Sequence, residues 1–129
     1  MSKHKEDISS LIEEAKQMIK TIETEELETL RQALSGDRGE DQKRIAVEGV
    51  SLISLLLSKN ADYGGSAWKS PLLAPGMTAR EAIQCRMSDK IERFRNLIQQ
   101  EGRAEIEESI EDTISDLTGY GILWMGAPV

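Results

Sequence analysis

The chain has 129 residues, of which 39% are hydrophobic and 30% are charged. This length and composition are typical of one globular domain and argue against disordered, collagenous and disulfide-rich classes. The 23 acidic residues outnumber the 16 basic ones, and the net charge is −7. A chain this acidic repels a phosphate backbone, so we expect no binding to long nucleic acids.

Residue types that favour helices dominate the chain, and aromatic residues make up only 4%. The sequence therefore predicts an all-α fold, a compact helical bundle of about four to five helices with a long ligand-binding loop between two core helices. The one cysteine, Cys85, has no internal disulfide partner, and no signal segment opens the chain, so we expect the cytoplasm of a bacterium or of a phage-infected host. No apolar run approaches the roughly 18 residues of a membrane span, so no membrane association is expected.

The first part of the chain reads as a helical arm. Apolar residues recur at helical spacing over residues 8–22 and resume out of phase over residues 27–34. The phase slip predicts a break near Thr24, which could cap a second short helix, and Gly36 is a predicted stop. We expect residues 1–40 to form this arm and to supply an oligomerisation surface, so that the protein is a homo-oligomer.

The remaining residues, 41–129, form the predicted helical domain. Its first helix, from about Gln42, is apolar on nearly all sides, so we expect it in the core. One carboxylate, Glu48, interrupts the apolar residues. Burial of a charge is costly unless the charge is paired or binds a cation. Glu48 is therefore either exposed near the helix start or a candidate metal ligand.

The loop after this helix carries many groups that bind ligands. It combines aromatic rings, an acid, an amide, lysines and paired glycines that permit close approach to the backbone. The candidate ligand-binding residues are Lys59, Asn60, Asp62, Tyr63, Gly64 and Trp68. Acid and amide side chains beside two glycines also make a good turn, in which case Tyr63 and Trp68 only cover the edge of the core.

A capping box, Thr78 followed by Glu81, predicts the start of the next helix. Lys90 falls inside the apolar stripe of this helix, and Arg86 and Arg93 border the stripe on the same side. A cation that points toward the core needs an anion, so a phosphate or a partner carboxylate is the expected target. The alternative is a lysine whose head reaches the rim of the core, which is common.

The last predicted helix, from Ala104 to Met125, carries a stripe of acids. Glu108, Asp112 and Asp116 follow one another one turn apart, and no lysine or arginine follows Ala104. Such carboxylates suit an oxygen-binding ion such as Mg²⁺, although a solvated acidic face is the alternative.

The acidic stripe runs into a segment that is apolar on nearly all sides. Continued by the same helical step, it reaches Gly119, Tyr120 and Leu123. We therefore expect the C-terminal end of the stripe to be covered, and a metal-lined cleft to lie there.

Three stretches of the sequence together resemble a known family. They are residues 59–64, residues 86–93, and residues 108–117 with the Gly-Tyr pair that follows. In this order they resemble the phage and bacterial nucleotide-modification-associated domain family, over about residues 45–125. More distantly the chain is similar to the MazG-like all-α nucleotide pyrophosphohydrolases, which hold Mg²⁺ with acidic pairs on two helices. Glu108 and Glu111 fit one such pair, whereas the helix of Glu48 offers a single acid.

The resemblance implies a Mg²⁺-dependent (or Mn²⁺-dependent) pyrophosphohydrolase that acts on a deoxynucleoside triphosphate, modified or unmodified. Glu111 would orient the attacking water. The expected metal ligands are Glu48, Glu108, Asp112 and Asp116. The expected nucleotide-binding residues are Lys59, Asn60, Asp62, Tyr63, Gly64, Trp68, Arg86, Lys90 and Arg93.

Two other functions stay open. One is a non-catalytic protein of phage origin that binds or sequesters nucleotides, with the basic and aromatic loop but without a complete metal site. In the enzyme, Lys90 could pair with Asp112 instead of with phosphate. The other is a helical interaction protein whose acidic stripe docks a basic partner. Binding of nucleotide in the presence of a chelator distinguishes the first of these from the enzyme.

Overall fold

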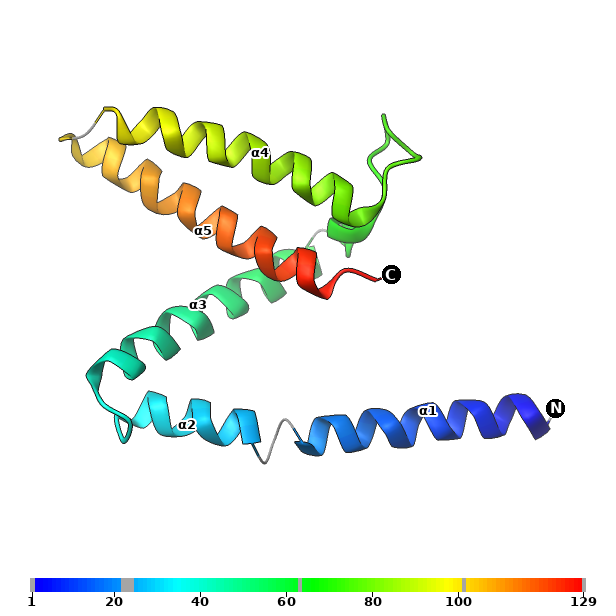
Figure 1. Ribbon diagram of the computed structural model, residues 1–129. Helices are drawn as coiled ribbons and strands as arrows, with labels where there is room; N and C mark the ends of the chain where they lie inside the picture. The colour runs from blue at the N-terminus through cyan, green and yellow to red at the C-terminus, as the bar shows by residue number, and fades with distance from the viewer. Residues whose placement is uncertain (1, 22–24, 63, 101, 129) are drawn as a thin grey trace. The chain divides into compact units, whose positions relative to one another are not determined.

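The computed structural model describes residues 2–21, 25–62, 64–100 and 102–128, and all their regular elements are helices (Figure 1). The α-helices and one short 3₁₀ helix are α1 (Ser2–Thr21), α2 (Leu27–Ser35), α3 (Glu40–Asp62), η2 (Ser66–Trp68), α4 (Ala79–Ile98) and α5 (Ala104–Gly126). The predicted all-α fold with four to five helices is confirmed. The predicted loop between two helices is present between α3 and α4.

The chain divides into two units, Met1–Val50 and Ser51–Val129. The division falls within α3, so this helix contributes its first half to one unit and its second half to the other. In the first unit, α2 ends at the predicted glycine, Gly36, which adopts a left-handed φ of 90°. A side chain is strained in that conformation, which explains a glycine there. The predicted cap at Thr24 lies outside the described residues.

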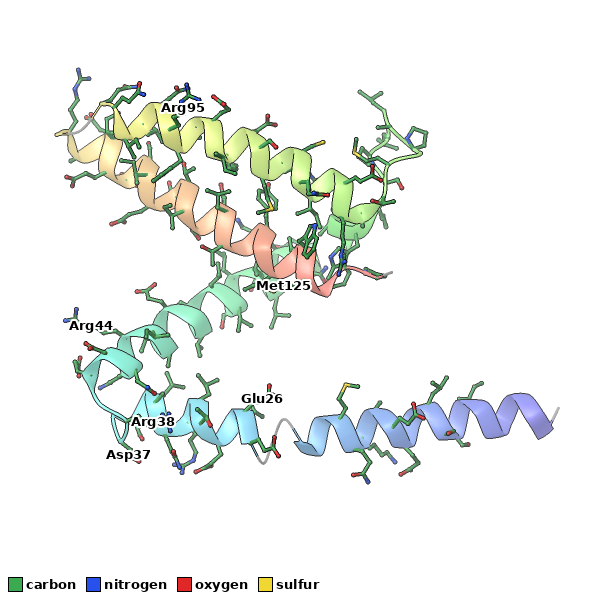
Figure 2. All side chains as sticks on the ribbon, in the orientation of Figure 1. Glu26, Asp37, Arg38, Arg44, Arg95 and Met125 are labelled. Atoms are coloured by element: carbon green, nitrogen blue, oxygen red, sulfur yellow. The ribbon has the colours of Figure 1, made fainter. Side chains whose placement is uncertain are left out.

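In the second unit, α4 and α5 run antiparallel and pack side by side (Figure 1). Ile83 on α4 is fully buried at 0% exposure, and Thr113 on α5 is 1% exposed. The buried hydroxyl of Thr113 donates a hydrogen bond of 2.7 Å to the carbonyl oxygen of Ser109, so its polar group is satisfied. The side of α4 away from α5 is solvated, and Arg95 lies there (Figure 2).

The predicted capping box begins α4. The backbone N–H of Glu81 donates to Thr78 Oγ1 at 3.1 Å, and the N–H of Thr78 donates to Glu81 Oε1, also at 3.1 Å. These hydrogen bonds satisfy two N–H groups that the first helical turn leaves without partners. The bonds from Thr78 also lower the pKa of the Glu81 carboxyl group, because they stabilise its charged form.

The C-terminal end of α5 is tied to η2 and to the start of α4. Trp68 Nε1 donates a hydrogen bond of 2.9 Å to the carbonyl oxygen of Leu123, and its ring lies against Gly126. Arg80 Nε donates to the carbonyl oxygen of Trp124 at 3.1 Å, and its guanidinium carbon lies 4.2 Å from the centre of that indole ring. These contacts satisfy carbonyl groups at a helix end and hold the loop against α5.

The prediction that α3 lies in the core differs from the structure. Ala46 is its buried residue, whereas Ile45 is 73% exposed and Leu57 is 66% exposed. Apolar residues surround this helix, and the rest of the chain covers only part of that surface. In the part of the chain that the structure describes, no helix is long and apolar enough to cross a membrane.

Candidate functional site

A cavity of about 270 Å³ lies within the unit Ser51–Val129. Four elements line it: the second half of α3, η2, α4 and α5. One wall is apolar and consists mainly of leucine side chains, Leu52, Leu55, Leu56 and Leu123. The cavity approaches the lower end of the volume range of small-molecule sites, roughly 300–1,000 Å³.

Polar side chains from three helices meet at the same cavity. The last turns of α3 supply Lys59 and Asn60, α4 supplies Arg86, and α5 supplies Asp116. All four are candidate residues from the sequence, and they come from three separate stretches of the chain: Lys59 with Asn60, Arg86, and Asp116. An apolar wall with a few convergent polar groups is the usual composition of a ligand site.

The turn after α3 brings η2 back to this cavity. Gly64 and Gly65 adopt left-handed φ angles of 62° and 76°, which favour glycine. The N–H of Gly65 donates to the carbonyl oxygen of Asn60 at 3.2 Å and closes the turn. Ser66 then follows at the cavity wall. The paired glycines therefore act in the chain reversal that completes the site.

Lys90 forms an ion pair with Asp116 at the cavity. Its Nζ atom lies 2.8 Å from Asp116 Oδ2, and the two side chains are 29% and 35% exposed. The sequence offered Asp112 as the carboxylate partner of Lys90, and the structure places the pair one turn further along α5. The cause is the register of the two antiparallel helices, which a helical periodicity does not define.

The other predicted acids on α5 lie outside the cavity wall. Glu108, Glu111 and Asp112 are exposed and precede Asp116 along the helix. Asp116 alone reaches the covered end of the acidic stripe, where Gly119 and the side chains after it form the wall.

The remaining candidate residues have varied positions. Arg93 is exposed on α4, and Asp62 is exposed at the end of α3. Trp68 contacts the end of α5 and is not a wall residue of the cavity. Glu48 is exposed and belongs to the unit Met1–Val50, and Tyr63 lies outside the described residues. The roles assigned to these side chains stay predictions.

A resident divalent metal ion needs several ligand atoms grouped in one place. Among the described residues, no group of three or more His, Cys, Asp or Glu side chains is placed to hold a metal ion. The one carboxylate on the cavity wall, Asp116, is already paired with Lys90. These residues therefore do not fit a resident metal ion. Mg²⁺ often binds through one or two carboxylates together with substrate phosphates, so an ion that arrives with a nucleotide is a separate case.

Sequence reasoning missed several wall residues. Tyr120 and Ser115 lie beside Asp116 on α5, and Ser66 lies on η2. The sequence pattern could have identified Tyr120, because the extended acidic stripe reaches it one turn after Asp116. No sequence pattern could have identified the leucines of α3 as wall residues, since their spacing is equally typical of a helix in the core.

Residues 59–125 of the chain match the sequence model of a family described as nucleotide modification associated domain 1. The match begins at Lys59 and includes η2, α4 and most of α5, which supply most of the cavity wall. No curated protein and no solved structure matches the chain. The more distant resemblance to the MazG-like enzymes stays a prediction.

Proposed function

The chain belongs to the nucleotide modification associated domain 1 family, and from this membership we propose that its cavity binds a nucleotide. One observation carries the proposal. Lys59 and Asn60 on α3 and Arg86, which lies 26 residues after Asn60 on α4, meet at one cavity that also has apolar side chains and an aromatic ring, and all three lie within the matched residues.

The two ends of a nucleotide have different chemistry, and the lining of the cavity offers both polar and apolar side chains. Lys59 and Arg86 can donate charge-assisted hydrogen bonds to phosphate oxygens, and the guanidinium group can bind two oxygens at once. The leucine wall and the ring of Tyr120 offer an apolar surface to the flat face of a base. Asn60 can pair with polar edges of the base or with the sugar.

The proposed reaction is hydrolysis of a deoxynucleoside triphosphate, modified or unmodified, supplied as its Mg²⁺ or Mn²⁺ complex. A water oxygen bonds to the α-phosphorus, the bond from that phosphorus to the bridging oxygen breaks, and pyrophosphate leaves. The ion, as part of the substrate, screens the phosphate charge and lowers the pKa of water. The carboxylates of α5 proposed to receive it are Glu108 and Asp112, and Glu111 is proposed to orient the water.

A second candidate is a protein that binds or sequesters a nucleotide without cleaving it. Two observations favour it: Asp116 is paired with Lys90, and the described residues hold no group of three metal-binding side chains. A site with cationic side chains and without grouped carboxylates can hold phosphates without activating a water molecule.

Calorimetry and a turnover assay on the full chain test both candidates. We expect at least one deoxynucleoside triphosphate to bind the wild-type protein with a measurable heat. Release of pyrophosphate at high protein concentration with Mg²⁺ or Mn²⁺ would support the enzyme, and binding without release would support the sequestering protein. Absence of binding by every common and modified nucleotide would contradict the proposed function.

We also propose that the protein is a homo-oligomer in the cytoplasm of a bacterium or a phage-infected cell. Apolar side chains on α1, among them Leu11, are exposed, and the same holds for α3. Burial of such side chains in a second copy is favourable. The single cysteine, Cys85, is free and exposed, which suits a reducing compartment.

A further inference from the structure

The charged side chains at the cavity favour binding of phosphate and disfavour binding of a metal ion. We propose that the cavity holds the phosphate chain of its nucleotide through its own cationic side chains, with no divalent ion required for binding, because Lys90 already neutralises Asp116. This inference rests on the proposed function for the identity of the ligand as a nucleotide. It does not depend on whether the ligand is later cleaved.

The ion pair cancels the only acidic charge that the described residues place on the cavity wall. Lys90 Nζ lies 2.8 Å from Asp116 Oδ2, a normal length for a charge-assisted hydrogen bond. The pair therefore contributes no net charge. Lys59 and Arg86 remain on the wall, and neither has an ion-pair partner among the described residues. The cavity is consequently cationic, although the chain as a whole carries a net charge of −7.

The same arrangement disfavours a resident metal ion. A divalent ion at Asp116 must displace the ammonium group, and it then lies close to the positive charges of Lys90 and Arg86. The two side chains of the pair are 29% and 35% exposed, so water only partly screens this repulsion. Among the described residues no third acidic or histidine ligand is grouped there to compensate.

Two possible roles of Asp116 predict different effects of the substitution Asp116→Asn on phosphate binding. If Asp116 binds a metal ion that bridges to phosphate, Asp116→Asn weakens binding of phosphates. If Lys90 neutralises Asp116, Asp116→Asn removes a competitor for the ammonium group, and phosphate binding strengthens or stays equal. Lys90→Met should weaken binding strongly, because it removes a cation and leaves an unpaired carboxylate at the cavity.

The experiment is calorimetry on the full chain with inorganic tripolyphosphate as the probe, in EDTA and in Mg²⁺. We expect the wild type and Asp116→Asn to bind in EDTA, and Lys90→Met to bind about tenfold more weakly. The double variant Lys90→Met/Asp116→Asn should regain at least about threefold over Lys90→Met, since the unpaired charge is gone. Lys69→Met, which removes an exposed lysine away from the cavity wall, should change the affinity by less than about twofold.

Several results would overturn the inference. They are loss of wild-type binding in EDTA, weaker binding by Asp116→Asn, and no recovery in the double variant. Thermal melting of each variant identifies a loss of fold, and recovery in the double variant cannot come from an unfolded chain. The proposed function fails separately, if tripolyphosphate binds in EDTA but no common or modified nucleotide binds. Nucleotide binding that strictly requires Mg²⁺ would overturn the inference and leave the proposed function standing.

Discussion

Gly119 on α5 lies against Leu56 on α3, so close that a Cβ atom at Gly119 would be 3.1 Å from Leu56 Cδ2. Both residues line the cavity, and Gly119 is buried. A glycine within a helix costs roughly 0.5–1 kcal/mol relative to alanine. The close approach of the two helices explains why a glycine stands at this position.

The substitution Gly119→Ala should therefore stabilise the protein less than the same substitution at a helical glycine with free space around it. Gly121 is the matched control, because a Cβ atom there meets nothing within 4 Å. We expect Gly121→Ala to raise the free energy of unfolding by roughly 0.5–1 kcal/mol, and Gly119→Ala to lie about 1 kcal/mol below it. Urea denaturation measures both. Equal gains for the two variants would show that Leu56 moves aside without cost.

Trp68→Phe should lower stability, because it removes the hydrogen bond to the carbonyl oxygen of Leu123 and keeps an aromatic ring. The expected loss in the free energy of unfolding is about 1 kcal/mol. Since Trp68 is not on the cavity wall, nucleotide affinity should change by less than about threefold. A large loss of affinity with unchanged stability would instead support stacking of Trp68 on the base.

Thr78→Ala should destabilise the protein by about 1 kcal/mol, because it removes the side-chain cap of α4. Thr118→Ala is the control, since Thr118 is exposed inside α5 and donates its hydroxyl only to the carbonyl oxygen of Ile114. Alanine is the better helix former at such a position, so no loss is expected there. Thermal melting of both variants checks the difference, and a similar loss at Thr118 would contradict the capping account.

The capping box should also make stability depend on pH. Hydrogen bonds from Thr78 hold the pKa of Glu81 below its ordinary value of 4.5. A lowered pKa in the folded state contributes stability above pH 4.5, and this contribution is lost as the pH falls below 4.5 through the lower folded value. Glu81→Gln should therefore be less stable than the wild type at pH 7, with a smaller difference at low pH. A difference independent of pH would contradict this assignment.

Leu11→Glu should lower the molecular mass measured by light scattering, if the exposed apolar face of α1 joins copies of the chain. Leu11 is 63% exposed in the structure. A charge placed within a buried apolar contact is strongly unfavourable. Ser10→Glu adds the same charge outside the apolar stripe of α1 and should leave the mass unchanged. A wild type that is monomeric at high concentration would contradict the proposed assembly.

Local signals in the sequence predicted much of the fold. The Thr78 and Glu81 pair located the start of α4, and Gly36 located the end of α2, because caps and glycine stops depend on neighbouring residues. The extent of α5 followed from its periodicity. The exposure of α3 was not predictable in this way, because a helix with apolar residues on all sides has the same pattern whether or not the chain covers it.

The site was predictable in its residue types more than in its geometry. Lys59, Asn60, Arg86 and Asp116 were all candidates, and the structure brings them to one cavity. Which acid faces Lys90 depends on the register of α4 against α5, so the carboxylate partner offered by the sequence was one turn away. Only tertiary packing distinguishes Asp116 from the exposed acids before it on the same stripe.

The central claim is that the cavity of residues 51–129 binds the phosphates of a nucleotide through Arg86. The most direct measurement is the affinity for deoxynucleoside triphosphates of the wild type, Arg86→Met and Arg95→Met by calorimetry. Arg95 is the matched control, because it lies on the solvated side of α4 and pairs there with Glu92 at 3.8 Å (Figure 2). We predict a loss of about tenfold or more for Arg86→Met and less than about twofold for Arg95→Met. Equal affinities of the two variants would contradict the account.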